Sequence, residues 1–256
     1  MECIMFKLLE EGLYPSSLVF FGNKELTLIL LTLLVVAVSY LLGSLNSAII
    51  ISKVMYGDDI RNHGSGNAGL TNMHRTYGLG AAGLTLLGDI LKTAISIIVA
   101  AVFFGFWYMG GVSTHYMGYV AGLFAVLGHV FPIYYKFKGG KGVLVTSAMA
   151  LILSPIPFLL IFLIFVLIVW LTKYISLGSV TGAMLYPVLL HSYFRLVLSN
   201  SPNGLVTLSA IILAIFIVWC HRGNLQRISN RTERKFSFKK KPEANAAPAD
   251  EDGENE

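Results

Sequence analysis

Long apolar runs dominate the chain and are separated by short stretches rich in glycine and charge. A helix that crosses a bilayer needs about 20 apolar residues, and about 17 at the least. The pattern predicts an all-α, polytopic integral membrane protein with about seven transmembrane helices. The predicted helices cover residues 26–51, 79–107, 116–135, 143–153, 156–171, 177–198 and 205–221.

The fourth and fifth apolar segments are separated by Ser154-Pro155-Ile156-Pro157. Each proline removes a backbone donor and resists continuation of a helix, so the pattern favours a tight turn between two helices. Residues 143–153 are few for a span, and one kinked helix over residues 143–171 is the alternative. That alternative would leave six spans.

The composition agrees with a membrane protein. Hydrophobic residues make up 55% of the 256 residues and charged residues only 13%, about half the share found in soluble domains. The mean hydropathy is +0.69. A soluble fold of this length would need far more polar surface, which excludes that class.

Positive charge marks one side of the predicted bundle. If the connections alternate sides, those at residues 105–115, 154–157 and 199–204 carry no Lys or Arg. Because Lys and Arg stay cytoplasmic, we predict the N-terminus outside and the C-terminus in the cytoplasm. With six spans this alternation would fail after Lys141. The other side carries Lys53, Arg61, Arg75, Lys136, Lys138, Lys141, Lys173 and the basic tail.

The two ends of the chain differ from its middle. Residues 1–25 are interpreted as an N-terminal extension, since charged residues interrupt any apolar core of a signal peptide. Beyond the transmembrane domain at residues 26–221 comes a basic cytoplasmic segment at 222–241, which suits anionic lipid. The acidic tail at 242–256 is predicted to be disordered. No nucleic-acid partner is expected, because no recognition unit accompanies the basic residues.

The first loop on the basic side, residues 57–75, gathers glycines with hydroxyl and amide side chains. Glycines let backbone N–H groups turn towards a ligand, and such concave nests bind anions. Arg75 adds a fixed charge and a forked donor set that suits phosphate. A flexible polar turn is the alternative. The clustered residues are Gly64, Ser65, Gly66, Asn67, Gly69, Thr71 and Asn72.

The second loop, residues 128–142, ends in Gly139-Gly140-Lys141-Gly142 directly before a predicted helix. A helix N-terminus carries free N–H groups and a positive dipole, so an anion fits beside Lys141. The loop is no Walker A motif, which requires Ser or Thr where this chain has Gly142. A lysine that snorkels to the interface is the alternative, and it suits Lys136 better.

Other polar residues admit two roles each. Asp89 and Lys92 lie three residues apart on one helix face, and a structural ion pair is favoured over a catalytic role. His129 serves either a cap or a ligand. No cluster has the spacing of metal ligands, so no metal is expected.

The ends of the last two predicted spans carry further polar residues. Either Ser176 or Ser179 serves as an N-cap of the sixth, or takes part in the site. His221 and Asn224 share a helix face at the inner end of the seventh.

Together these motifs resemble the bacterial membrane acyl-phosphate–glycerol-3-phosphate acyltransferases. The resemblance covers roughly residues 40–235, and its specificity comes from the order of the motifs. They are DIRNHGSGNAGLTN at 59–72, GHVFP at 128–132, FKGGKG at 137–142, YISL at 174–177, and HRGN at 221–224 with Glu233.

The resemblance implies transfer of a fatty acyl group from acyl phosphate to the sn-1 hydroxyl of glycerol 3-phosphate, without a cofactor. It further implies a bacterial cell membrane, a site facing the cytoplasm, contact with membrane lipid and a functional link to an enzyme that makes acyl phosphate. The implied catalytic residues are Ser65, Arg75, Lys141, Ser179, His221 and Asn224. The implied substrate-binding and phosphate-binding residues are Gly64, Gly66, Asn67, Gly69, Thr71, Asn72, His129, Gly139, Gly140 and Gly142.

The residues themselves agree with this chemistry. Both substrates carry phosphate, and the donor is an activated mixed anhydride that needs positioning and charge stabilisation more than a strong nucleophile. No His is followed by Asp at the spacing His-x4-Asp typical of acyl-CoA-dependent acyltransferases. A transporter for a phosphorylated solute is the competing class, but the chain shows no internal repeat and no paired broken helices.

Three positions depart from the family pattern. The segment Asn46-Ser47-Ala48 stands where the family has Pro-Phe-Gly. Gly223 replaces a Glu, and Arg231 replaces a Gly two residues before Glu233.

The charge pattern predicts which loops an impermeant reagent can reach. In a chain without Cys3 and Cys220, Gly110→Cys should react with an impermeant thiol reagent in whole cells, and Asn62→Cys should not. Labelling of the two positions in intact and lysed cells measures this. The reverse pattern would overturn the orientation.

Overall fold

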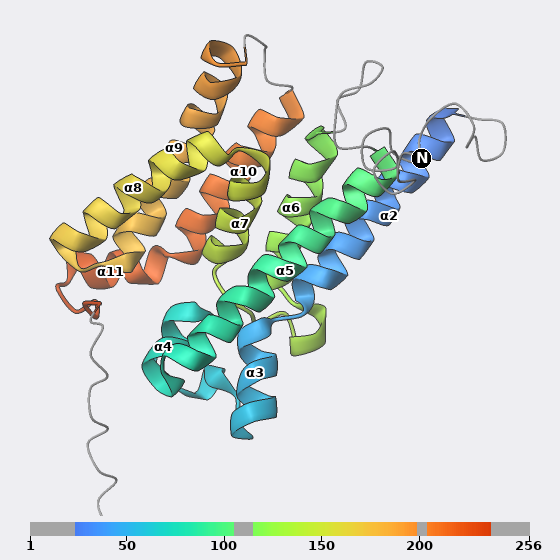
Figure 1. The fold of residues 1–256 in the computed structure, drawn as a ribbon. Helices are drawn as coiled ribbons and strands as arrows, with labels where there is room; N and C mark the ends of the chain where they lie inside the picture. The colour runs from blue at the N-terminus through green and yellow to red at the C-terminus, as the bar shows by residue number, and fades with distance from the viewer. Residues whose placement is uncertain (1–23, 105–114, 199–203, 237–256) are drawn as a thin grey trace, which may run out of the picture.

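The computed structural model describes residues 24–104, 115–198 and 204–236. Within these ranges the chain is helical, without strands, which confirms the all-α prediction. The described residues form ten α-helices and two 3-10 turns, whose arrangement can be followed in Figure 1. They are α2 (Lys24–Ser44), α3 (Ser47–Tyr56), η2 (Ile60–Asn62), α4 (Leu70–Tyr77), α5 (Leu79–Phe104), α6 (His115–Val130), η3 (Ile133–Tyr135), α7 (Val143–Leu153), α8 (Pro155–Thr172), α9 (Ile175–Leu196), α10 (Gly204–Cys220) and α11 (Arg222–Ser229).

Every predicted apolar segment contains a helix, and five stretches are long and apolar enough to cross a membrane. A sixth is reached when α10 and α11, which meet at a 52° bend, count as one span. The helix α7 has only 11 residues and is about 16 Å long, too short to span alone. The multi-pass membrane fold is therefore supported, while the count of seven spans stays a prediction.

The first predicted helix is wrong in one respect, because it is broken in two. Asn46 ends the run by capping α3, where its side-chain oxygen accepts a hydrogen bond from the Ile49 amide at 3.1 Å. The carbonyl oxygens freed at the break, those of Gly43 and Leu45, accept hydrogen bonds from the Lys92 ammonium at 3.2 and 3.1 Å. A buried cation thus stabilises the open turn between α2 and α3.

The turn predicted at the prolines is confirmed. The helix α7 ends at Leu153 and α8 begins at Pro155, where a missing N–H costs nothing. Ser154 lies fully buried at the corner, its hydroxyl 3.1 Å from both the Ala150 carbonyl oxygen and the Tyr186 hydroxyl. The chain reverses there (Figure 1).

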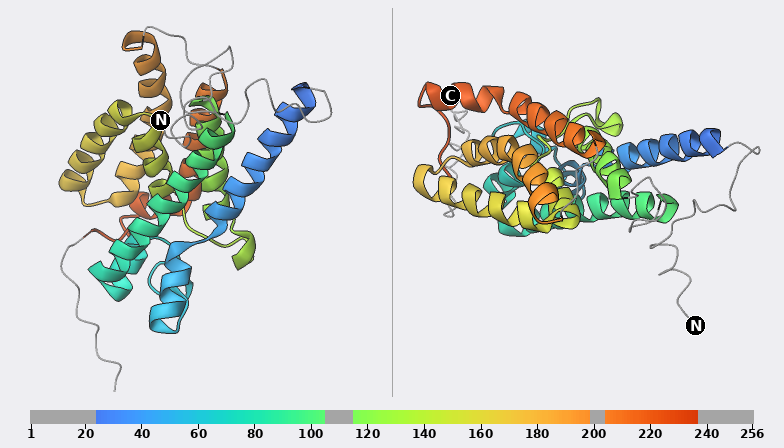
Figure 2. Two further views of the ribbon diagram at one scale, coloured as in Figure 1. Left: turned by 45° about the vertical axis from the view of Figure 1, so that its right-hand side comes forward. Right: turned by 90° about the horizontal axis from the view of Figure 1, so that it is seen from above.

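Close packing of α2 against α6 depends on two glycines. A Cβ at Gly43 would lie 2.2 Å from the Ala125 carbonyl oxygen, and one at Gly128 would lie 2.2 Å from the Tyr40 carbonyl oxygen. The main hydrophobic core lies between α6, α7, α9 and α10. The helices α2 and α8 stand on opposite sides of the bundle (Figure 2).

Most of the turns that carry Lys and Arg share one end of the molecule, while Arg195 in the last turn of α9 and Lys24 at the start of α2 lie at the other. At the shared end, Figure 1 shows α3, α4 and α11, together with the connection from α6 to α7 and the step from α8 to α9. The end of α5, the start of α6, the end of α9 and the start of α10 lie at the opposite end. The helix ends that flank two of the three charge-free connections thus lie together, and the membrane topology stays a prediction. The predicted N-terminal extension at 1–25 lies almost wholly, and the acidic tail at 242–256 wholly, outside the described residues.

Candidate active site

A cavity of about 730 Å³ opens among the basic-side loops and runs between α5, α7, α8 and α9. Its loop end is polar, while α7 and α8 contribute apolar side chains such as Leu151, Ile161 and Phe165. Most of the predicted site residues lie together on its wall. They are Gly64, Ser65, Asn67, Gly69, Thr71, Asn72, Arg75, His129, Lys141, Gly142, Ser179, His221 and Asn224.

Asn72 gives the first loop its shape. Its side-chain amide donates to the carbonyl oxygens of Ile60 and His63 at 3.2 and 2.9 Å, and its oxygen accepts from the Ser65 amide at 3.1 Å. Gly64 has a φ of +59°, and a Cβ there would lie 2.2 Å from the Asn72 oxygen. The Asn72 amide is therefore used inside the loop, where it positions the backbone around Ser65 rather than pointing a free donor at a ligand.

Arg61 joins the first loop to the second and was not among the predicted site residues. Its guanidinium is held by Asp59 at 2.7 Å and donates to the carbonyl oxygens of Tyr135 and Lys138, both at 3.0 Å. The hydrogen bond from Arg61 holds the pKa of Asp59 down at about 2, so the pair stays charged. Nothing local in the sequence indicates this contact, because its partners lie more than seventy residues away.

Three predicted glycines lie outside the cavity lining: Gly66, Gly139 and Gly140. A Cβ at Gly139 would lie 2.0 Å from the His129 carbonyl oxygen. One at Gly140 would lie 2.1 Å from His129 Nε2 and 2.6 Å from the Ala68 carbonyl oxygen. Gly139 therefore lets the second loop fold back on itself, and Gly140 lets it pack against the first loop at Ala68. Gly66 forms a turn at a φ of +70°.

Lys141 lies between the packed Gly140 and Gly142, directly before α7. Its half-buried ammonium donates a hydrogen bond to the Asn224 side-chain oxygen. Burial lowers the pKa of Lys141, and the nearby Glu233 carboxylate opposes that shift. Within the described residues, no side-chain hydrogen bond caps α7 at Gly142, so its first backbone N–H groups are open beside this cation.

Glu233 connects three side chains of the site through hydrogen bonds. In the sequence it was noticed only as part of a family motif. Its Oε1 accepts from the Ser176 hydroxyl and the Asn224 amide, both at 2.6 Å, and its Oε2 accepts from Arg227 Nε at 2.7 Å. Burial acts to raise the pKa of Glu233, but these hydrogen bonds outweigh it and leave the pKa below its ordinary value. Ser176 is therefore a site residue rather than an N-cap, the cap position of α9 being Tyr174.

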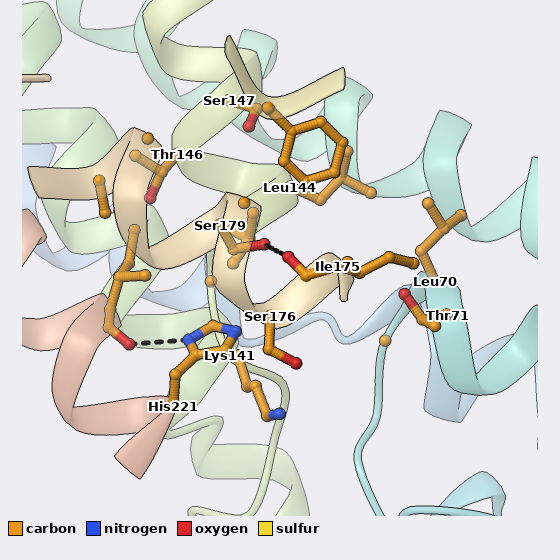
Figure 3. Close-up of a pocket in the computed structure, with 18 of the residues that line it drawn as sticks. Leu70, Thr71, Lys141, Leu144, Thr146, Ser147, Ile175, Ser176, Ser179 and His221 are labelled. Atoms are coloured by element: carbon orange, nitrogen blue, oxygen red, sulfur yellow. Dashed lines mark hydrogen bonds between the residues drawn. The ribbon is translucent and has the colours of Figure 1, made fainter. Parts of the chain in front are cut away.

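His221 and Ser179 both line the cavity, and Figure 3 shows the Ser179 hydroxyl turned to Ile175. The His221 Nδ1 donates to the Ile217 carbonyl oxygen at 2.8 Å, so Nε2 of the neutral ring is an acceptor directed into the cavity. The Ser179 hydroxyl donates to the Ile175 carbonyl oxygen at 2.9 Å, which leaves its oxygen lone pairs for a ligand.

Arg75 supplies an open cation. It projects from α4 into the cavity half-buried, and no hydrogen bond or ion pair holds its guanidinium within the described part of the chain. Burial and then Arg234 lower the pKa of Arg75, while Glu233 raises it. The described residues hold no group of three or more His, Cys, Asp or Glu side chains placed for a metal ion. The arrangement suits an anion with several oxygens.

Comparison with known proteins gives the family. A family model for glycerol-3-phosphate acyltransferase matches residues 33–231, most of the chain. The chain belongs to the glycerol-3-phosphate acyltransferase family. The glycerol-3-phosphate acyltransferase of Bacillus subtilis (strain 168) is 39% identical over 212 residues, covering 82% of this chain and 100% of the relative. That of Clostridioides difficile (strain 630) is 37% identical over 208 residues, covering 81% and 97%.

Two solved structures that resemble this chain belong to a glycerol 3-phosphate acyltransferase as well. The crystal structure of PlsY, an integral membrane glycerol 3-phosphate acyltransferase, in its glycerol 3-phosphate form matches with a TM-score of 0.69 at 32% identity. The match covers 80% of this chain and 96% of that one. The lysophosphatidic acid form of the same enzyme matches with a TM-score of 0.67 at 30% identity, covering 81% and 96%.

The departures from the acyltransferase pattern now have a structural reading. Asn46 caps α3, and the Ser47 hydroxyl donates to Asp89 at 2.9 Å. A Cβ at Gly223 would meet only Arg227 Nη1, at 3.6 Å, so a side chain fits there. Arg231 has a φ of +58°, a conformation that favours the family's glycine and costs another residue about 1 kcal/mol.

Lys141→Ala should lower acyl transfer about 10²- to 10³-fold, because a positioned charge contact at the cavity is lost. Lys136→Ala is the matched control, since Lys136 is exposed on the same loop and does not line the cavity. The measurement is the initial rate of product formation by each purified variant. Similar rates for both would reduce Lys141 to an interfacial charge.

Proposed function

We propose that this enzyme transfers a fatty acyl group from acyl phosphate to the sn-1 hydroxyl of glycerol 3-phosphate, giving lysophosphatidic acid and phosphate. Family membership makes it an acyltransferase that acts on glycerol 3-phosphate. The observation that carries the finer proposal is one cavity in which open cations adjoin an apolar channel. Such a cavity suits a substrate with a phosphate at one end and a fatty chain at the other.

The phosphate end would use Arg75 and Lys141. Both cations stand near Glu233 but neither forms an ion pair with it, so they keep attraction for an added anion. The open amides at the start of α7 and the first loop, as shaped by Asn72, supply further donors. The loop residues proposed to line this phosphate site are Gly64, Ser65, Asn67, Gly69, Thr71 and Gly142.

The fatty chain would lie along α7 and α8. Ile161, Phe162 and Phe165 of α8 line the cavity, as do Leu86 and Ile90 of α5 across from them. Transfer of each buried CH₂ from water contributes about 0.8 kcal/mol, so this wall favours a long acyl chain over a short acid. The amphiphilic donor would thus sit with its reactive carbonyl near Ser179.

The reaction would be a direct substitution at the acyl carbon. The sn-1 oxygen forms a bond to that carbon, and the carbon–oxygen bond to phosphate breaks with its electron pair leaving on phosphate. Arg75 and Lys141 stabilise the leaving phosphate, which takes up the released proton. Nε2 of His221 accepts the hydrogen bond of the attacking hydroxyl, while Asn224 holds Lys141 in place.

The site is proposed to face the cytoplasm from a bacterial cell membrane. The basic-end turns that surround the cavity include Lys136, Lys138 and Arg222, and such residues stay on the cytoplasmic side. Acyl phosphate is a product of acyl-group activation, so an enzyme of that class is the functional link that we propose.

The donor assignment can be tested on the purified enzyme in detergent. Lysophosphatidic acid should form from acyl phosphate and glycerol 3-phosphate, and not from acyl-CoA, because the cavity offers phosphate contacts and nothing resembling a nucleotide-binding loop. A chelator should leave the rate unchanged. Labelled glycerol 3-phosphate gives the rate for each donor.

Two outcomes would contradict the proposal. Comparable turnover of acyl-CoA would overturn the donor. Absence of product from either donor, combined with uptake of labelled phosphate into liposomes that contain the protein, would favour a transporter.

A further inference from the structure

Three titratable side chains are buried together beside the cavity: Asp89 and Lys92 of α5 and His129 of α6. Their exposed fractions are 1%, 6% and 3%. Asp89 Oδ1 lies 2.8 Å from the Lys92 ammonium, which confirms the ion pair predicted from the sequence, and accepts a hydrogen bond from Ser47 at 2.9 Å. Burying three such groups is costly unless each is paired, so their placement calls for a reason.

The Lys92 ammonium is fixed from several sides. It donates to the carbonyl oxygens of Gly43 and Leu45 at the break between α2 and α3, and it pairs with Asp89. Its remaining neighbour is Nδ1 of His129, at 3.0 Å. Asp89 itself is 3.7 Å from that nitrogen, too far for a hydrogen bond.

This contact decides where the proton of His129 sits. An ammonium group carries three donors and no acceptor, so Lys92 shares its three N–H groups among the two carbonyl oxygens, Asp89 and Nδ1. The ring nitrogen that faces it must therefore present a lone pair, so Nδ1 is unprotonated and the neutral ring carries its hydrogen on Nε2. A carboxylate that accepts a hydrogen bond from Nδ1–H fixes a histidine proton on Nδ1. Here the Lys92 ammonium donates to Nδ1 and so fixes the proton on the other nitrogen, Nε2.

The Nε2–H of His129 points away from the ion pair, towards the place where Gly140 of the second loop meets Ala68 of the first loop. Only a glycine fits beside it, because a Cβ at Gly140 would lie 2.1 Å from Nε2. Within the described residues, no protein group accepts a hydrogen bond from this nitrogen, and His129 lines the same cavity as Arg75 and Lys141. A nearly buried donor without a protein acceptor indicates an acceptor on the ligand.

We propose that Asp89 and Lys92 are positioning residues that lock His129 in its Nε2–H tautomer, and that this N–H binds a phosphate oxygen of a substrate. The inference rests on the proposed function. The family resemblance already implies phosphate binding by His129, and what is new here is the lock by Asp89 and Lys92 and the ring atom that binds. His129 binds as a neutral donor, so it adds direction to the site without adding a third cation beside Arg75 and Lys141. The phosphate can belong to the acyl donor or to glycerol 3-phosphate.

The tautomer of His129 can be determined without measuring enzyme activity. The full chain with ¹⁵N-labelled histidine is studied by NMR in detergent micelles, and loss of one signal set in His129→Gln assigns His129. The wild-type ring should show protonated Nε2 and unprotonated Nδ1, and inorganic phosphate should shift the Nε2 signal. Lys92→Met should produce a mixture of tautomers, whereas the exposed His191 should be unchanged and serves as the internal control.

The kinetics of two His129 variants test whether the Nε2–H donates a hydrogen bond to a substrate phosphate. The amide of His129→Gln places an N–H near the Nε2 position, and that of His129→Asn places one near Nδ1 only. Loss of a hydrogen bond to a charged group costs about 1.5–3 kcal/mol, so His129→Asn should lose about 10- to 100-fold in kcat/KM while His129→Gln recovers much of that loss. The substrate whose KM rises identifies which phosphate is bound.

Several results would overturn the proposal. They are a protonated Nδ1 in the wild type, an Nε2 signal that phosphate does not move, or equal activity of the Gln and Asn variants. A wild-type enzyme that shows the Nε2–H tautomer and its phosphate shift but forms no lysophosphatidic acid would refute the proposed reaction instead. The two failures are thus distinguishable.

Discussion

An excess of positive charge in a partly buried cavity is the constraint on which the rest of the site depends. Among the described residues that line the cavity, four are Lys or Arg and two are Asp or Glu. Asp89 is already paired with Lys92, so Arg75, Lys141, Arg227 and Arg234 share Glu233. Burial disfavours the charged forms of Arg75 and Lys141, whereas Arg227 and Arg234 are exposed, and an incoming phosphate relieves that cost.

The surrounding residues keep Lys141 from forming an ion pair with the Glu233 carboxylate. Asn224 stands between Lys141 and Glu233 and bonds to both, so the ammonium is held by a neutral group. On the other side, Arg61 and the close approach at Gly140 bind the second loop to the first. Lys92 fixes the break in the first apolar segment and the ring of His129 at once. Each of these contacts links segments that are distant in sequence.

The sequence was sufficient for features that depend on local pattern. Apolar runs predicted the helices, paired prolines predicted the corner at Ser154, and glycines beside a cation singled out Arg75 and Lys141. It was insufficient where long-range partners decide the role. The first helix was not expected to break, because the stabilising cation, Lys92, comes from another helix.

The same limit applies to the predicted site residues. Gly139 and Gly140 were assigned to phosphate because glycine-rich loops often bind it, whereas here they make room for His129. The role of Ser176, cap or site residue, stayed open because its partner, Glu233, lies 57 positions away. Glu233 carried a signal only through the family motif, since a single carboxylate in a basic tail has no distinctive local pattern.

The central claim is that the cavity is completed by phosphate, and ligand-dependent stability tests it most directly. A ligand that binds the folded state at 100 times its Kd stabilises that state by about 2.7 kcal/mol. Thermal unfolding of the purified protein should therefore shift to higher temperature with inorganic phosphate, compared with chloride at equal ionic strength. The shift should largely disappear in Arg75→Gln. An equal shift with chloride, or a full shift in Arg75→Gln, would contradict the account.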